Sequence, residues 1–429
     1  MKKILFILLL ISQSVSAQQK CTDKNLPIVF VHGFMGSGDN WATQIQRFSS
    51  NGFCEDKLFV FDWNSIGGGS TTSTSLNKFI DGVLKKTNAT KINLVGHSAG
   101  GGVCYAYLKD SVQALKVAKY VHIGSTKMKA PAGKNNEIPT MNIYSTDDKV
   151  IKNGGDIAGA INVKQTGNDH MQVATSAATF TPMYNFFTET SGKANPTILP
   201  SKAYYKQITG KGVVMAENTI LSLDSVICYN YNPKNGKRFF TKKRGDDSSY
   251  TGWMRFGKED GTFTFNVTKD QYLEFEVQPT NGRRVFYYFE PFMRNNKNIY
   301  LRALPTGGMA AAMLGNIPND DKQTALVIFT ANNAVIAGRD SLAIDSIPLS
   351  LPQLMPANKT SIACFLFDDG DELTSGKALK SLSAAPFLTG VDVFIKAEEN
   401  KTMCIYYNGR SIVLPKRKSK DGIMIVVFN

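Results

Sequence analysis

Hydrophobic and polar positions follow one pattern in the first half of the chain and another in the second. Between residues 26 and 190, short runs of nearly all-apolar residues alternate with longer stretches of mixed polarity. The apolar runs lie at residues 27–31, 57–61, 92–95, 120–123 and 141–144. Strands that are apolar at every position are buried on both faces, as in a parallel sheet with helices on each side. The first half is therefore predicted to have an α/β fold with a mostly parallel sheet that is covered by helices on both faces.

After about residue 200, apolar residues alternate with polar ones, as in strands that bury one face. Three Asn-Gly pairs lie beside or between such runs, and this dipeptide is the strongest short-range signal for a hairpin turn. The pairs are Asn235-Gly236, Asn281-Gly282 and Asn408-Gly409. The second half is therefore predicted to be an all-β domain, mostly antiparallel and built as a barrel or a sandwich.

The first 17 residues are predicted to be a signal peptide. Lys2 and Lys3 precede an apolar run that is too short to span a bilayer, and Ala17 suits cleavage by a signal peptidase. We therefore expect the mature protein to be secreted or periplasmic.

Composition also sets the expected domain boundaries. Residues 18–190 form the α/β domain, residues 191–200 a linker of mainly small and polar residues, and residues 201–429 the β domain. The Pro- and Gly-containing stretch at residues 305–308 is a candidate break between two sub-modules of the β domain.

The net charge of +14 over 429 residues narrows the classes of partner. No basic helix or aromatic–basic repeat accompanies the excess, which argues against a nucleic-acid-binding protein. A solvated basic surface is the simpler interpretation, and weak attraction to anionic membranes or interfaces is the alternative. The β half contains none of the four histidines, which argues against a histidine-based metal site there. We expect no metal and no cofactor.

Residues 91–102, with the sequence KINLVGHSAGGG, join an apolar strand to a run that can form a helix. The junction is Gly96-x-Ser98-x-Gly100, and strand, sharp turn and helix together are the context of a nucleophile elbow. Glycines flank the serine because a Cβ atom near so sharp a bend would clash. Ser98 is therefore the candidate nucleophile.

A serine nucleophile needs a base that takes its proton. In an α/β hydrolase the base follows the nucleophile along the chain, so only His122 and His170 are eligible. His122 lies inside an apolar strand, where a core histidine is expected. His170 lies in a loop after a strand near residues 161–163, and it is the candidate base.

The base in turn needs an acid that orients it. The strand at residues 141–144 is followed by Asp147 and Asp148, and both remain candidates on spacing alone. Asp169 is too close to His170 in sequence to turn back onto its ring.

The oxyanion of an acyl-transfer intermediate needs backbone N–H donors. One is expected from Ala99, which follows the nucleophile, and the other from Phe34, in the turn after the first strand. Apolar residues near the predicted sheet edge are candidate contacts for an acyl chain. They are Met35, Trp63, Ile66, Met128, Val150, Ile151 and Met171.

Several of these motifs together resemble the small, lidless bacterial lipases (class 2). The resemblance is carried by residues 26–34, 95–101, 143–148 and 167–172, and it covers roughly residues 26–190. It implies a triad of Ser98, His170 and Asp148, with Phe34 and Ala99 as the oxyanion donors.

The whole chain resembles an archaeal lipase or carboxylesterase with a C-terminal β-barrel domain. Shared stretches include residues 47–53, 287–292 and 423–427. The archaeal acid comes from an earlier strand, where this chain has Gly124-Ser125. The bacterial pattern therefore places the acid at Asp148, and Asp147 is the fallback.

The lipase topology also bears on the cysteines. It makes the strands at residues 28–31 and 57–61 parallel neighbours, so Cys21 and Cys54, which precede them, start at the same end of the sheet. A disulfide between these two is predicted for an exported protein. Cys104 is expected to be a buried thiol, and the sequence does not fix the pairing of Cys228, Cys364 and Cys404.

These features predict a secreted serine ester hydrolase that acts on lipid esters through an acyl-enzyme. A depolymerase of aliphatic polyesters with the same triad is one alternative. A lipid- or surface-binding protein with an idle hydrolase domain is another. Because residues 18–190 hold every proposed catalytic atom, a fragment without the β domain is expected to keep activity on short esters.

Overall fold

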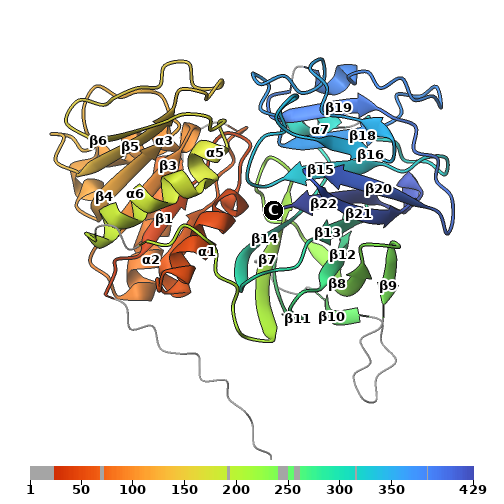
Figure 1. Cartoon of the computed structure of the whole chain (residues 1–429). Helices are drawn as coiled ribbons and strands as arrows, with labels where there is room; N and C mark the ends of the chain where they lie inside the picture. The colour runs from red at the N-terminus through yellow and green to blue at the C-terminus, as the bar shows by residue number, and fades with distance from the viewer. Residues whose placement is uncertain are drawn as a thin grey trace, which may run out of the picture.

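The computed structural model describes residues 24–67, 72–190, 194–239, 250–255, 261–314, 316–383 and 385–429. Figure 1 shows an N-terminal α/β part beside a second part made mainly of strands. The fold class predicted from the sequence is confirmed for both parts. Among the described helices, none has the length and apolar character needed to cross a membrane.

Six parallel strands form the N-terminal sheet, in the order β2-β1-β3-β4-β5-β6. Their bounds are β1 (Ile28–Val31), β2 (Leu58–Phe61), β3 (Ile92–His97), β4 (Val117–Ile123), β5 (Thr140–Ser145) and β6 (Ile161–Gln165). Each apolar run predicted to be a strand lies in this sheet. In β1, Ile28 and Phe30 enter the core on one face, and Val29 and Val31 enter the core on the other.

Helices cover both faces of this sheet, which is why its central strands are apolar throughout. One face packs against α1 (Ala42–Ser50), α5 (Gln172–Thr175) and α6 (Ala177–Thr188). The other packs against α2 (Thr72–Thr87), α3 (Ala99–Leu108) and α4 (Ser111–Ala114). Two 3₁₀ helices, η1 (Gly38–Trp41) and η2 (Glu55–Lys57), precede α1 and β2.

A nine-stranded sheet is the centre of the second part, in the order β10-β8-β12-β13-β22-β15-β18-β19, with β9 paired to β8. Its strands are β8 (Leu223–Asn232), β9 (Lys237–Phe239), β10 (Tyr250–Arg255), β12 (Tyr272–Pro279), β13 (Val285–Phe289), β15 (Leu326–Thr330), β18 (Ala363–Phe367), β19 (Leu388–Asp392) and β22 (Ile423–Phe428). Strands from both sides of residue 305 therefore share this sheet.

Two smaller sheets pack on opposite faces of the nine-stranded sheet. One contains β7 (Tyr205–Val214), β11 (Thr262–Thr268) and β14 (Asn296–Ala303). The other contains β16 (Leu342–Ile344), β17 (Ile347–Pro348), β20 (Thr402–Tyr407) and β21 (Arg410–Pro415). The helix α7 (Gly308–Leu314) and the 3₁₀ helices η3 (Lys380–Leu382) and η4 (Ser419–Asp421) complete this part.

The three Asn-Gly pairs lie in antiparallel hairpins, as predicted. They connect β8 to β9, β12 to β13 and β20 to β21. In the last hairpin Asn408 and Gly409 have φ values of 45° and 78°, which a two-residue type I′ turn requires.

The expectation of mostly antiparallel pairing is confirmed, since nine pairings among the described strands of the second part are antiparallel. The other four pairings among the described strands of the second part are parallel: β7 with β14, β13 with β22, β15 with β22, and β18 with β19. Parallel neighbours are joined by long connections, so no local turn signal marks them in the sequence. The nine-stranded and three-stranded sheets are therefore mixed, whereas the sheet of β16, β17, β20 and β21 is antiparallel throughout.

The structure shows which of the described cysteines form a disulfide bond. Cys54 is disulfide-bonded, whereas Cys21, its predicted partner, lies outside the described residues, so the pairing stays a prediction. Cys104, Cys228, Cys364 and Cys404 are not disulfide-bonded.

Candidate active site

Ser98 occupies a strained turn between β3 and α3. Its φ of 54° and ψ of −126° lie outside the regions that most residues adopt. A Cβ at Gly96 would lie 2.8 Å from Sγ of Cys104, and one at Gly100 would lie 2.4 Å from the backbone oxygen of His32. Close approach of neighbouring atoms therefore explains both glycines of the motif.

The structure brings Ser98, His170 and Asp148 into one hydrogen-bonded chain. His170 Nε2 lies 3.0 Å from Ser98 Oγ, and His170 Nδ1 lies 2.8 Å from Asp148 Oδ2. All three residues are buried. With a proton on Nδ1, the imidazole donates to the carboxylate and leaves Nε2 as an acceptor for the serine hydroxyl.

Asp148 is held in place as a charged group. Its Oδ1 accepts hydrogen bonds from the backbone N–H groups of Val150, at 2.9 Å, and Ile151, at 3.1 Å. Burial opposes the charge, but the hydrogen bond from His170 and these two N–H groups leave the pKa of Asp148 below its usual value.

Asp147, the alternative acid, has a different role in the turn. Its carboxylate is exposed and accepts a 2.7 Å hydrogen bond from the backbone N–H of Gly167. That hydrogen bond lowers the pKa of Asp147. In the structure, Asp148 is the aspartate that contacts His170.

Asp169 fixes the loop that carries His170. Its Oδ1 accepts hydrogen bonds from the N–H groups of Met171, at 2.8 Å, and Gln172, at 2.9 Å. Its Oδ2 faces the β-rich part, where it pairs with Arg339 Nη1 at 2.8 Å and accepts from Ala334 N at 3.2 Å. This buried carboxylate therefore links the predicted base to the second part of the molecule.

The other three histidines are buried beside the site or in its supporting core. His97 donates from Nε2 to the backbone oxygen of His170 at 3.0 Å, and burial lowers its pKa to about 3. His122 accepts from the Tyr120 hydroxyl at 2.8 Å, and burial lowers its pKa to about 4. Burial also lowers the pKa of His32. All three are therefore neutral at pH 7.

The predicted oxyanion donors lie on either side of Ser98. Gly33 passes so close that a Cβ there would lie 2.9 Å from Cβ of Ser98, and Phe34 follows it directly. Within the described chain the Phe34 N–H has no hydrogen-bond partner. Ala99 is the first residue of α3, so its N–H has no partner within the helix. Both donors remain free to bind an oxyanion.

Two adjoining cavities lie beside the site. The smaller contains Ser98 and His170 and is walled by Phe34, Met171 and Phe387, among others. The larger opens to solvent and shares Gly36, Asn40, Ile362 and Phe387 with the smaller one. Its remaining lining is largely apolar: Met35, Ser37, Asp39, Ile66, Met215, Ala216, Phe289, Arg302, Leu314, Phe329, Thr330, Ala331, Leu388 and Val427.

More than half of the larger cavity's lining comes from the β-rich part, and sequence reasoning missed all of it. Phe387 is the clearest case, because its ring stacks on His170 with centroids 6.0 Å apart and planes at 18°. Nothing in the sequence marks it, since it lies 217 positions after His170 and is one of 26 phenylalanines.

The residues predicted to contact the substrate fall into three groups: some line the cavities, some pack in the core, and some hold Asp148 in place. Met35 and Ile66 line the larger cavity, and Met171 lines the smaller. Trp63 donates from its indole to the backbone oxygen of His32 at 3.0 Å, and Met128 packs against the core beneath α3. Val150 and Ile151 supply the N–H groups that hold Asp148.

Comparison with known proteins agrees with this architecture. A family model for the alpha/beta hydrolase fold matches residues 27–136, and a second model, for a C-terminal domain, matches residues 313–428. The N-terminal part therefore has the α/β-hydrolase fold, and a distinct C-terminal domain follows it.

Several solved structures resemble the N-terminal part. A predicted CIB-like hydrolase of Thermoplasma acidophilum is 16% identical, with 39% of this chain and 88% of that one covered and a TM-score of 0.30. A mature lipase of Bacillus licheniformis is 13% identical, with 38% and 91% covered and a TM-score of 0.30. Lipase B of Aspergillus fumigatus is 14% identical, with 41% and 55% covered and a TM-score of 0.31.

Proposed function

We propose that this protein is an exported serine hydrolase of esters with apolar acyl chains, that is, a lipase or carboxylesterase. The observation that carries the proposal is the chain of hydrogen bonds from Asp148 through His170 to Ser98, with Ser98 and His170 in a small cavity that adjoins a larger, mainly apolar one. A strained serine, a histidine within hydrogen-bond distance of it and a buried carboxylate in this order are the parts that acyl transfer requires.

In the proposed reaction, Ser98 Oγ attacks the ester carbonyl carbon while His170 Nε2 takes the hydroxyl proton. Asp148 stabilises the imidazolium that forms. The N–H groups of Phe34 and Ala99 stabilise the oxyanion, and removing one such donor typically costs about 3–4 kcal/mol. The C–O bond then breaks, His170 protonates the leaving alcohol, and a water molecule hydrolyses the acyl-enzyme by the same steps.

The cavity lining supports an acyl chain as the substrate group. Most side chains around the larger cavity are aliphatic or aromatic, and apolar cavities with a few polar groups bind ligands by burying apolar surface. Because this cavity joins the smaller one at Phe387 and Ile362, an acyl chain held there has its carbonyl carbon near Ser98. Arg302 and Asp39, paired at 2.6 Å, are the charged residues of the wall.

Export is supported by the chemistry of Cys54. A disulfide persists in oxidising compartments and is rare in the cytosol of most bacteria. The bond therefore agrees with the signal peptide expected from residues 1–17, and we propose a secreted or periplasmic location. Weak binding to anionic interfaces, suggested by the +14 charge, is part of the same proposal.

The test is a profile of kcat/KM on nitrophenyl esters from two to sixteen acyl carbons, with Ser98→Ala as the blank. We expect hydrolysis that rises with chain length, and loss of nearly all of it in Ser98→Ala. Triacylglycerol emulsions and solid aliphatic polyester, run in parallel, separate a lipase from a depolymerase. Turnover by Ser98→Ala close to that of the native protein would refute the proposed nucleophile. Binding of lipid without hydrolysis would favour the idle-domain alternative.

A further inference from the structure

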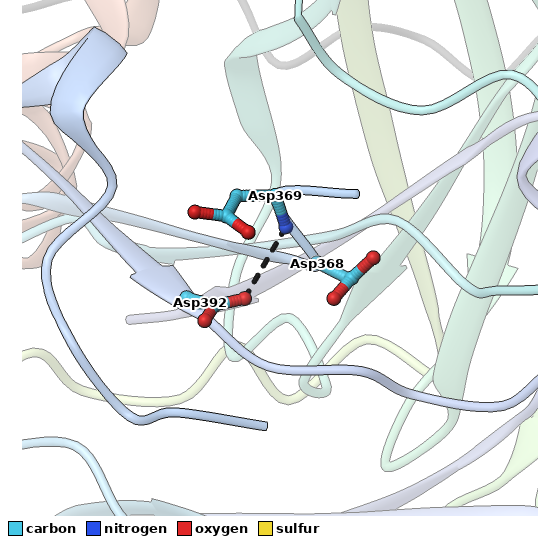
Figure 2. Close-up of side chains that lie close together, drawn as sticks. All are labelled: Asp368, Asp369 and Asp392. Atoms are coloured by element: carbon cyan, nitrogen blue, oxygen red, sulfur yellow. Dashed lines mark hydrogen bonds between the residues drawn. The ribbon is translucent and has the colours of Figure 1, made fainter. Parts of the chain in front are cut away.

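Three carboxylates meet where β18 and β19 end, at the opposite ends of these strands from the cavities near Ser98. β18 continues directly into Asp368 and Asp369, and β19 ends at Asp392. The two strands are parallel, with Phe367 opposite Asp392, so their carboxyl ends lie at the same edge of the sheet. One carboxylate oxygen from each aspartate lies within 4.8 Å of the others, and Figure 2 shows the three side chains around one small region.

Two of these carboxylates are buried without a cation. Asp368 is 3% exposed and Asp392 is 4% exposed. Within the described residues, no lysine, arginine or histidine forms an ion pair with any of the three. Like charges this close repel one another, and a buried carboxylate without a positive partner is costly. The cluster therefore lacks the positive charge that would balance it.

The hydrogen bonds leave one buried oxygen with no partner. Oδ2 of Asp368 accepts from the N–H groups of Gly370, at 2.9 Å, and Glu372, at 3.1 Å. Asp392 accepts from Asp369 N at 3.2 Å and from the Ser375 hydroxyl. By contrast, Oδ1 of Asp368 is buried and has no hydrogen-bond partner. A buried acceptor without a partner in an otherwise well-bonded turn is a place where a water molecule or a cation can bind.

We propose that Asp368, Asp369 and Asp392 bind a calcium ion. All the candidate ligand atoms are carboxylate oxygens, which calcium prefers and zinc does not. Calcium–oxygen bonds are about 2.4 Å long, so ligands on opposite sides of the ion are about 4.8 Å apart. The three oxygens lie within that distance of one another, close enough to share one ion, and calcium tolerates an irregular ligand geometry better than magnesium does. Asp369 is exposed, so water can complete the coordination.

The role that follows is stabilisation of the cavity wall. The opposite ends of the same two strands adjoin Ile362, Phe387 and Leu388, which line the cavities at Ser98. An ion that joins the carboxyl ends of β18 and β19 holds these strands together without touching the reacting atoms. The site therefore does not depend on the function proposed above.

The test uses the full-length protein, stripped with EDTA and then freed of the chelator. We expect one calcium ion to bind by calorimetry, terbium to report the same site by luminescence, and saturating calcium to raise Tm by a few degrees. Magnesium at the same concentration should have a much smaller effect. Absence of any calcium-dependent change in the native protein overturns the proposal.

Single substitutions distinguish calcium binding at this site from adventitious binding elsewhere on the protein. Asp392→Asn and Asp369→Asn should each weaken calcium binding at least tenfold and reduce the Tm shift. Asp369 is the safer variant, because its exposed carboxylate makes no hydrogen bond within the described residues and its loss should not prevent folding. Asp224→Asn, which removes an exposed charge elsewhere in the β-rich part, is the matched control and should bind as the native protein does. Equal binding by Asp369→Asn and Asp224→Asn would also overturn the proposal.

Discussion

At the scale of single residues, Asp147 and Asp148 show how surroundings separate two identical side chains. Asp148 contacts His170, whereas Asp147 braces a turn at the surface. We predict that Asp148→Asn lowers kcat by about 10⁴-fold, because an amide favours the wrong imidazole tautomer. Asp147→Asn should stay within a few-fold of the native protein. The measurement is kcat on nitrophenyl butyrate for both variants.

Asp148→Asn and Asp147→Asn serve as controls for each other, since each removes one charge from the same turn. Similar and mild losses would mean that neither aspartate is the acid. The sequence left both residues open, because spacing along the chain does not say which of two adjacent side chains turns inward. That choice depends on the hydrogen bonds from Val150 and Ile151, which exist only in the folded turn.

A second prediction at this scale concerns His122 and the dependence of the unfolding free energy on pH. Its pKa is about 4 in the folded protein against an ordinary value of 6.5, so between these values the unfolded chain binds one more proton. Stability contributed by the neutral ring is present above pH 6.5 and is lost as pH falls towards 4. We predict that His122→Gln reduces the slope of unfolding free energy against pH by about 1.4 kcal/mol per unit in this window.

Urea denaturation at several pH values from 4 to 7 measures that slope. Asn93→Gln, which changes a buried polar residue that does not titrate, serves as the control. Parallel slopes for the native protein and His122→Gln would contradict the prediction, because they would mean that the ring takes up its proton at the same pH in the folded and unfolded states.

At the scale of elements, the first turn of α3 contains three consecutive glycines with different surroundings. A Cβ at Gly100 would meet backbone oxygens of β1 and His32 at 2.4–2.6 Å, whereas one at Gly102 would meet nothing within 4 Å. We predict that Gly100→Ala loses several kcal/mol of stability or fails to fold. Gly102→Ala should gain about 0.5–1 kcal/mol, because alanine favours a helix. Thermal unfolding of the pair measures both, and equal effects would contradict the close approach.

Local signals explain which elements could be predicted. The strands of the parallel sheet are apolar on both faces, and each Asn-Gly turn specifies its own hairpin, so a short window of sequence suffices. β22 also forms a continuous apolar run, but its parallel neighbours β13 and β15 are distant in sequence. Pairings of that kind depend on the packing of the whole β-rich part, which no window contains.

At the scale of the whole molecule, the two parts share the site. Phe387 stacks on His170, and Arg339 pairs with Asp169 beside it. The expectation that a fragment ending near residue 190 keeps activity on short esters must therefore change. Such a fragment retains Ser98, His170 and Asp148, but it loses much of the cavity wall and the group that neutralises buried Asp169.

Arg339 offers a test that keeps the chain intact. We predict that Arg339→Ala lowers kcat several-fold, with little change in KM for a short ester, because the loop of His170 loses a partner. Arg339→Lys should restore part of the loss. Arg294→Ala is the control, since Arg294 contacts backbone oxygens of Ser49 and Leu199 and not the histidine loop. A change in KM alone would contradict a positioning role. The same loss of kcat in Arg294→Ala would contradict it too.

The place of β22 in the nine-stranded sheet has a consequence for how the protein is made. Residues 423–428 lie between β13 and β15, so the middle of the sheet stays open until the ribosome has synthesised them. The α/β part is complete some 230 residues earlier and meets no such delay. During translation, the backbone edges of β13 and β15 that face β22 therefore stay unpaired, and a chaperone or an export factor can hold the nascent chain there.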